Sequence, residues 1–304
     1  MQLCVVDMGT NGFLCIKPHT LHKYSILGKY LNVCKIFDKC YSNFVYVDTH
    51  GGSGRVQLDS KNLEWMNGSP LIAATRTPQF PCHVVEIDPQ RYESLCTSTK
   101  DCDNVKAYNG DCNNLVAGIL STIPKGQKFV FCFIDPESLV YRGNDGDCDQ
   151  LRADTVRAIA AFPRTELLLN FPLESLLRCA GDYYNNPNAP RAISTAERVT
   201  TYMGSESWKA LVPNNRDRRD FLELYMNEML APYRFKGAIL IRSQQNNLPL
   251  YYLVYATHNF TAAKIMRDIM MKEDNYTPNY DLTKMRVLTK DEAYPPNRFV
   301  FERE

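Results

Sequence analysis

Residues 44–56 constrain the fold of this chain most, because they join a short apolar strand to an acid and a glycine-rich turn. The apolar residues 44–47 end at Asp48, and the turn Gly51-Gly52-Ser53-Gly54 follows closely. Strand, acid and tight turn in this order are typical of the first half-site of nucleotide-binding α/β proteins. Glycines allow the backbone to approach a ligand that a Cβ atom would keep away. The segment therefore predicts a site for a nucleoside-like cofactor.

Further apolar runs predict the rest of the sheet. They lie at residues 82–88, 105–108, 129–134, 166–172, 237–241 and 250–256. The first four are mostly continuous rather than alternating in polarity, as in strands buried on both faces of a parallel sheet. Helical patterns separate them, which favours a doubly wound sheet. The last two runs are joined by a short loop and must be antiparallel.

We therefore expect an α/β, Rossmann-like fold with a mostly parallel seven-stranded sheet, a C-terminal antiparallel hairpin and helices on both faces. Parallel strands followed by an antiparallel terminal pair are the topology of class I S-adenosylmethionine-dependent methyltransferases.

Polar side chains follow the expected carboxyl ends of the first five strands: Asp48, Glu86, Asp111, Asp135 and Asn170. In open α/β sheets, ligands bind at these ends, near the point where the strand order reverses. A carboxylate just before the glycine turn disfavours a pyrophosphate, which such a turn otherwise attracts. It favours a ligand with a cationic group. S-adenosylmethionine carries an ammonium and a sulfonium, so it is the expected cofactor.

Each of these residues has an expected role. Glu86 would accept from the ribose hydroxyls, and Asp111 from the adenine amino group. Asp135, which Pro136 follows, would lie beside the transferable methyl group and orient or deprotonate the acceptor as the catalytic residue. The residues expected to hold the cofactor are Asp48, His50, Gly52, Gly54, Glu86 and Asp111.

The 304 residues are expected to form a single methyltransferase-like domain with four parts. These are a helical extension at 1–43, a cofactor-binding half at 44–172, an inserted substrate or partner segment at 173–218, and a C-terminal half at 219–304. Within the first part, apolar residues at helical spacing predict a helix over 19–31.

The inserted segment contains an aromatic loop with Tyr183 and Tyr184 and a basic run that includes Arg216 and continues to Arg219. Together with Asn170, these are candidates for contact with a nucleic acid, because basic groups bind phosphates and aromatic rings stack on bases. A solvated charged helix with a loose loop explains the segment equally well.

Composition narrows the class of protein. A net charge of +1 provides no general attraction to nucleic acid or membrane, so any basic surface must be local. The sequence has no apolar run of transmembrane length and no secretory pattern at its N-terminus, so a cytoplasmic protein without membrane contact is expected. The 11 cysteines include no C-x-x-C pair, which predicts reduced thiols and no metal site.

The ordered motifs resemble the three-Cys-motif partner family, a bacterial and phage-associated family with a methyltransferase-like fold. The matching segments are residues 19–31, 46–48, Gly52, Gly54, 68–71, 85–88, 134–136, 169–172 and 253–257. The resemblance implies a methyltransferase-like domain and a protein partner from a neighbouring gene. It alone implies a nucleic acid or a modified base as substrate.

The chain departs from the family pattern at two places. In the turn Asp-x-Phe-Ala-Gly-Pro-Gly, this sequence has His50, Gly51 and Ser53 instead of Phe, Ala and Pro. His50 is an ionisable ring that could form a pocket wall or act as a base. After Asp135-Pro136 the chain continues with Glu137-Ser138, so the Asn/Asp-Pro-Pro-Tyr/Phe signature of amino-methylating enzymes is incomplete.

Three functions follow from this sequence. The first is a methyltransferase, and the second is a non-catalytic partner or scaffold protein with the same fold. The third, a nicotinamide oxidoreductase, expects a glycine where Asp48-Thr49-His50 stands and explains neither Asp111 nor the terminal hairpin.

Overall fold

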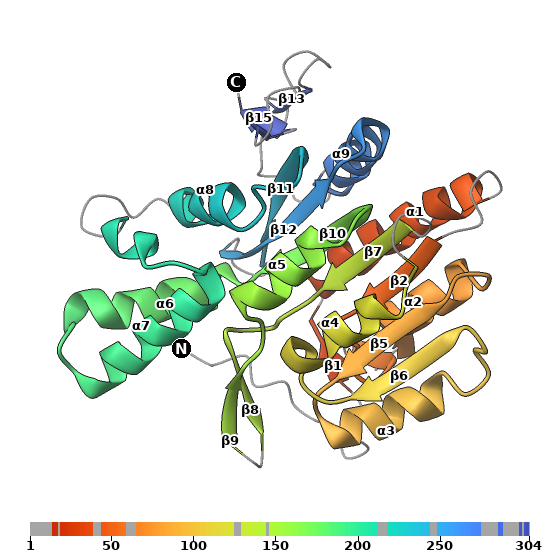
Figure 1. Cartoon of the computed structure of the whole chain (residues 1–304), viewed down its shortest axis with the longest axis horizontal. Helices are drawn as coiled ribbons and strands as arrows, with labels where there is room; N and C mark the ends of the chain where they lie inside the picture. Colours follow the sequence, from red (N-terminus) through yellow and green to blue (C-terminus); the bar gives the residue numbers. More distant parts are fainter. Residues whose placement is uncertain are drawn as a thin grey trace.

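Figure 1 shows the computed structural model of the chain, in which a central sheet carries helices on both faces. The structure describes residues 14–17, 19–38, 44–58, 65–124, 129–143, 146–211, 218–243, 248–274, 285–287, 298–299 and 301–303.

The central sheet has the strand order β14-β11-β12-β10-β7-β2-β5-β6. Its strands are β2 (Phe44–Asp48), β5 (Cys82–Glu86), β6 (Val105–Asn109), β7 (Phe129–Ile134), β10 (Thr165–Phe171), β11 (Phe235–Arg242), β12 (Pro249–Thr257) and β14 (Arg298–Phe299). The strands from β6 to β10 are parallel, whereas β12 runs antiparallel between β10 and β11. The expected fold is confirmed, and β14 adds one short strand parallel to β11 at the edge.

The continuous apolar runs are explained by the layers of the molecule. Every residue of β2 and of β10 is buried, because helices cover both faces of the sheet. Removal of this apolar surface from water is the main force that assembles the layers.

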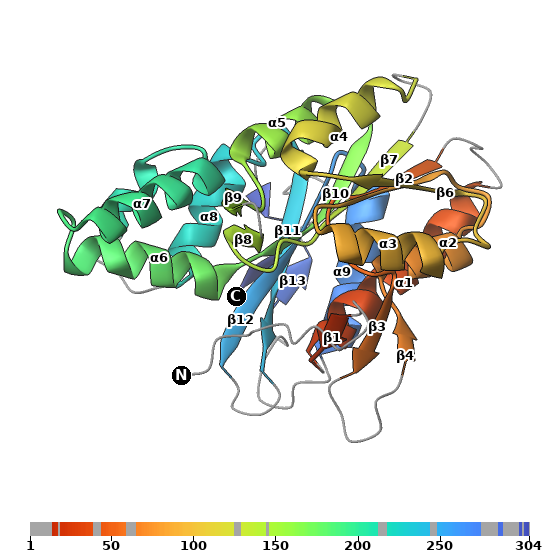
Figure 2. The same ribbon diagram turned by 90° about the horizontal axis from the view of Figure 1, so that it is seen from below.

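One face of the sheet carries α1 (Thr20–Asp38), α2 (Ser69–Arg76) and α9 (Phe260–Asp274), whose apolar side chains share a core with those of β2, β7 and β12. Helix α3 (Pro89–Ser98) lies beside α2 on this side (Figure 2). The other face carries α4 (Cys112–Ser121) and α5 (Ala153–Ala161), which belong to a second core.

Helix α1 is an integral layer of the domain. Its side chains Ile26, Leu27, Tyr30 and Leu31 are at most 3% exposed. The preceding strand β1 (Leu14–Ile16) forms a small sheet with β3 (Arg55–Leu58) and β4 (Trp65–Asn67). The predicted helix over 19–31 is therefore confirmed, and it extends further than its predicted end.

The segment after β10 is helical. It contains α6 (Leu173–Asn185), α7 (Pro190–Met203) and the 3₁₀ helix η1 (Ser207–Ala210), and α8 (Arg218–Glu228) follows. The prediction of a loop at Tyr183 and Tyr184 was wrong, because both residues lie in the last turn of α6, which ends only at Asn185. Arg216 lies outside the described residues, and Arg219 begins α8 with Arg218.

Two two-stranded antiparallel sheets complete the described structure: β8 (Val140–Gly143) with β9 (Gly146–Asp149), and β13 (Met285–Val287) with β15 (Phe301–Arg303). Of the helices that the structure describes, none combines the length and the apolar composition that a membrane span requires.

Candidate functional site

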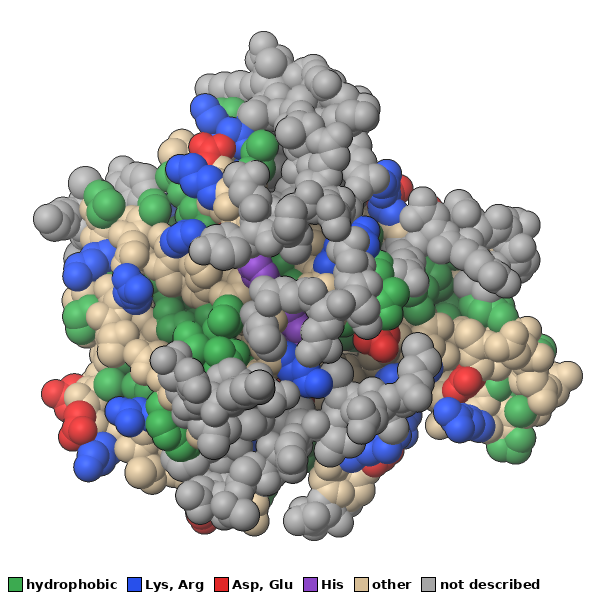
Figure 3. Space-filling view, turned by 180° about the vertical axis from the view of Figure 1, so that it is seen from behind, with side chains coloured by type: hydrophobic (Ala, Val, Ile, Leu, Met, Phe, Trp, Pro, Cys, Tyr) green, Lys and Arg blue, Asp and Glu red, His purple; other side chains and the backbone are tan. Residues whose placement is uncertain are grey.

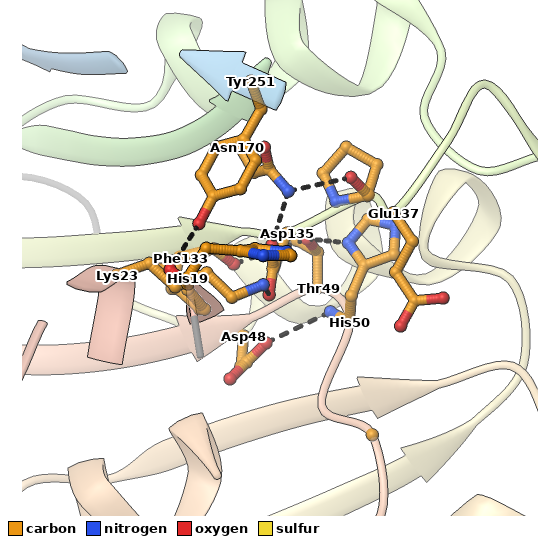
Figure 4. A network of polar contacts seen from close by, with 12 residues as sticks. His19, Lys23, Asp48, Thr49, His50, Phe133, Asp135, Glu137, Asn170 and Tyr251 are labelled. Carbon is orange, nitrogen blue, oxygen red and sulfur yellow. Dashed lines mark hydrogen bonds and ion pairs between the residues drawn. The ribbon is translucent and has the colours of Figure 1, made fainter. Parts of the chain in front are cut away.

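The candidate site lies where the winding of the sheet reverses. From β2 the chain passes to β5 and β6 on one side, and it then returns to β7 on the other side of β2. The carboxyl ends of β2 and β7 flank this switch point, where ligands bind in open α/β sheets. Asp48 is the last residue of β2, and Asp135 directly follows β7. Figure 4 shows both carboxylates within one polar network.

Asp48 is a fully buried carboxyl group. It accepts hydrogen bonds from the backbone N–H of His50 at 3.1 Å and from the hydroxyl of Tyr46 at 2.9 Å. The hydroxyl of Ser69, the first residue of α2, also donates to it. Burial raises the pKa of Asp48 to about 6, although these hydrogen bonds lower it. The switch point thus holds a carboxyl group whose charged form is disfavoured by burial.

The glycine turn after Asp48 is tightly packed. The N–H of Gly51 donates to the carbonyl oxygen of Val85 at 2.8 Å. A Cβ atom on Gly51 would lie 2.2 Å from Cγ1 of Val84. Gly52 and Gly54 adopt φ angles of 61° and 75°, which favour glycine. The turn therefore requires glycine both for close packing and for its backbone conformation.

Glu86, the last residue of β5, holds this turn in place. Its Oε2 accepts from the N–H of Gly52 at 2.7 Å, and its Oε1 accepts from the N–H of Asp88 at 2.9 Å. Burial raises the pKa of Glu86 to about 7. Each carboxylate oxygen has two lone pairs. The side chain can therefore keep both backbone bonds and still accept from a ribose hydroxyl.

His50 is held in one orientation through both ring nitrogens. Its Nε2 lies 3.1 Å from the carbonyl oxygen of Gln150, to which it donates, and its Nδ1 accepts from the hydroxyl of Thr49 at 2.7 Å. Burial lowers the pKa of the ring. A neutral ring with both nitrogens occupied fits the role of a pocket wall and not the role of a base.

Asp135 is held from two sides. Its Oδ2 lies 2.5 Å from Nζ of Lys23 on α1, and its Oδ1 accepts from the side-chain amide of Asn170 at 2.9 Å. The same amide donates to the carbonyl oxygen of Pro136 at 3.2 Å. The side chains of Lys23 and Asp135 are each only 9% exposed. The structure thus brings the predicted residues Asp135, Pro136 and Asn170 together and adds a buried cation to them.

Asp111 caps the N-terminus of α4, two residues after the end of β6. Its Oδ1 accepts from the N–H of Asn113 at 2.8 Å, and its Oδ2 lies 3.6 Å from the guanidinium of Arg152. The contact between Asp111 and an adenine amino group stays a prediction.

Tyr183 and Tyr184 lie with Trp208 rather than in the network of Figure 4. Their ring centroids are 5.5 Å and 6.0 Å from that of Trp208, and the hydroxyl of Tyr184 donates to the Trp208 carbonyl oxygen. Nζ of Lys209 lies 5.4 Å from the centroid of the Tyr183 ring. The two tyrosines therefore take part in the packing of α6 against η1.

Lys23 is the residue of this site that sequence reasoning missed. The predicted helix was assigned from its apolar residues, and a lysine within it reads as a solvated charge. One signal was present, because Lys23 lies four residues before Leu27 and eight before Leu31 and so shares their buried face. A lysine on the apolar face of a helix needs a buried anion, and Asp135 provides it.

The described part of the chain shows no metal cluster, and the cysteines described in it are not paired. No group of three or more His, Cys, Asp or Glu residues is placed there to hold a metal ion. The eight cysteines whose side chains the structure describes are all free thiols.

Comparisons with known proteins give structural matches only. No protein family profile matches the sequence, and no curated protein matches it. A Legionella pneumophila protein of the DUF519 family is 13% identical over 83% of this chain and 92% of its own, with a TM-score of 0.48. M. jannaschii TYW2 in complex with AdoMet is 11% identical over 71% of this chain and 68% of its own, with a TM-score of 0.35. The O-methyltransferase from Bacillus cereus in complex with SAH is 15% identical over 76% of this chain and 80% of its own, with a TM-score of 0.38.

The strand order of the protein itself defines its class. A parallel sheet that reverses between β2 and β7, with an antiparallel strand inserted between its last two parallel strands, is the class I methyltransferase fold. Membership of the three-Cys-motif partner family stays a prediction.

Proposed function

We propose that the protein is an S-adenosylmethionine-dependent methyltransferase. The observation that carries this proposal is the buried Asp48 at the switch point, whose pKa is raised to about 6 by burial. A ligand with an ammonium and a sulfonium would favour the ionised carboxylate. When bound, S-adenosylmethionine supplies an activated methyl group.

The residues around the switch point fit this cofactor. Asp48 lies where the cationic end of the ligand would be attracted, and the glycine turn follows it directly. Glu86 has lone pairs left for the ribose hydroxyls. Asp135 and Pro136 lie on the side of β7, where the acceptor would enter. The residues proposed to hold the cofactor are Asp48, His50, Gly52, Gly54, Glu86 and Asp111.

The proposed acceptor is a nucleic acid or a modified base, and this part rests on the family resemblance. Lys and Arg side chains are spread over the face shown in Figure 3, and histidine side chains lie near its middle. Such side chains bind phosphate groups. Arg219 and the Tyr183–Lys209 pair lie on the helical segment after β10 and stay candidates for this contact.

Isothermal titration calorimetry with the pure protein tests the cofactor. We expect micromolar binding of S-adenosylmethionine, loss of binding in Asp48→Ala, and normal binding in the exposed control Asp154→Ala. Binding of NAD with similar affinity, or no binding of S-adenosylmethionine, would contradict the proposal.

A second function is favoured by one observation. Both oxygens of Asp135 accept hydrogen bonds within the protein, from Lys23 and from Asn170. A partner or scaffold protein with no need for a reactive Asp135 would have the same arrangement. Normal function of Asp135→Ala in cells, together with co-purification of a partner chain, would favour this role.

A further inference from the structure

The groups around Asp135 present hydrogen-bond donors to the acceptor side of the site. Asp135 accepts from Lys23 and from Asn170, and the Pro136 carbonyl oxygen also accepts from Asn170. The ammonium of Lys23 has three N–H donors, and one of them is directed at Asp135. A group that approaches Asp135 therefore meets the Lys23 cation as well as the carboxylate.

The charge that develops on the acceptor atom distinguishes nitrogen from oxygen acceptors. A neutral amine that takes a methyl group from a sulfonium gains positive charge as it reacts. A hydroxyl that releases its proton gains negative charge on its oxygen. A buried ammonium stabilises the negative charge that develops on a hydroxyl oxygen, and it opposes the positive charge that develops on an amine.

The cation is fixed in position before any substrate arrives. Lys23 is 7% exposed, and its Nζ lies 5.6 Å from the centroid of the Tyr24 ring. Burial and the charge of Lys23 lower the pKa of nearby His19 to about 4, so this ring is neutral at physiological pH. Tyr251 donates its hydroxyl to the His19 carbonyl oxygen at 3.2 Å and so ties β12 to the start of α1. Groups fixed in this way can stabilise a developing charge without reorganisation.

We propose that the methyl acceptor is the 2′-hydroxyl of an RNA ribose, bound beside the paired Lys23 ammonium and Asp135 carboxylate. This inference rests on the proposed function. A hydroxyl in the interior of a nucleic acid chain is the ribose 2′-hydroxyl, which RNA has and DNA lacks. In the reaction, the ribose oxygen bonds to the methyl carbon while the carbon–sulfur bond breaks with its electron pair left on sulfur. The hydroxyl proton passes to Asp135 and then to solvent.

The position of the methyl group tests this inference. Random-sequence RNA and DNA of equal length are incubated with the full chain and S-adenosylmethionine labelled in the methyl group, and the RNA is then hydrolysed in alkali. A 2′-O-methyl group blocks hydrolysis, so we expect the label in alkali-resistant dinucleotides and none in DNA. Label in mononucleotides or in DNA overturns the inference but leaves the proposed function intact. Absence of label from a protein that binds S-adenosylmethionine in calorimetry also overturns it, whereas absence of that binding refutes the proposed function itself.

Binding of RNA provides a readout that does not depend on turnover. In fluorescence anisotropy with S-adenosylhomocysteine present, we expect RNA to bind more tightly than DNA of the same sequence. Lys23→Met should reduce this preference by about tenfold, because it removes a charged hydrogen bond to the hydroxyl, and should lower kcat about 100-fold.

Two variants keep this test free of folding effects. The double variant Lys23→Met/Asp135→Asn leaves no unpaired buried charge, and it should lose the RNA preference as completely as the single variant does. Lys35→Met is the matched control on the same helix, since Lys35 is exposed in its last turn. An RNA preference that survives in Lys23→Met, or that is lost equally in Lys35→Met, contradicts the role of Lys23.

Discussion

The burial of Asp48 predicts that the site is unstable without its ligand and that Asp48→Asn stabilises the free protein. The pKa of Asp48 is raised from its ordinary value of 3.8 to about 6. A difference of this size corresponds to roughly 3 kcal/mol of folding free energy once the group is ionised. Asparagine has the same shape and no charge. Its oxygen can accept from the N–H of His50, and its amide can donate to the hydroxyls of Tyr46 and Ser69.

The pH dependence of this effect identifies its cause. Because the folded pKa lies above the unfolded one, the stability that the neutral carboxyl group contributes is fully present below about pH 4. It is lost as the pH rises through about 6. In urea unfolding of the free protein, Asp48→Asn should therefore be about 2–3 kcal/mol more stable than the wild type at about pH 8 and nearly equal to it at about pH 4.

A matched control distinguishes the effect of burial on stability from the effect of removing any carboxylate charge. Asp154 is 90% exposed on its side chain and pairs with Arg157 at the surface, so Asp154→Asn should change stability by less than about 0.5 kcal/mol at either pH. A stabilisation by Asp48→Asn that is the same at both pH values, or a loss of stability at high pH, would refute the reasoning from burial.

Four further predictions concern the ligand, the glycines Gly51 and Gly118, and Glu86. The affinity for S-adenosylmethionine should rise in calorimetry as the pH increases through about 6, because the cation favours the ionised form of Asp48. Gly51→Ala should lower stability in urea unfolding by about 1–3 kcal/mol, since its Cβ atom would lie 2.2 Å from Val84 Cγ1. Gly118→Ala, in α4 with no atom within 4 Å of the added Cβ, should stabilise by about 0.5–1 kcal/mol. Glu86→Gln should cost roughly 1–3 kcal/mol, because one of two backbone N–H groups then faces an amide donor.

The sheet and its carboxylates could be predicted from the sequence because their signals are local. The runs that became β2 and β7 are buried on both faces, so they are continuously apolar, and their order alone implies the switch point. Asp48 and Asp135 follow these runs directly in the chain. No contact across the molecule had to be known to place them at the same edge of the sheet.

The features that could not be predicted from the sequence depend on contacts between distant segments. Lys23 and Asp135 are separated by 112 positions, and their pairing follows only from how α1 docks on the sheet. The predicted loop at Tyr183 and Tyr184 was wrong for the same reason. Asparagine and proline after Tyr184 suggested a loop, whereas packing of Tyr183 and Tyr184 against Trp208 supports helical structure up to Asn185.

The position of Lys23 on α1 links the chemistry of the site to the survival of the protein in the cell. The same helix covers Tyr46, Phe131 and Phe133 on one face of the sheet. A truncated copy that begins at residue 44 would retain every carboxylate of the site and lose the ammonium, but it would also expose this apolar face to other chains. We expect such a copy to aggregate or be degraded rather than persist as a binder of cofactor without its cation. Quality control would thus remove the truncated form from the cell.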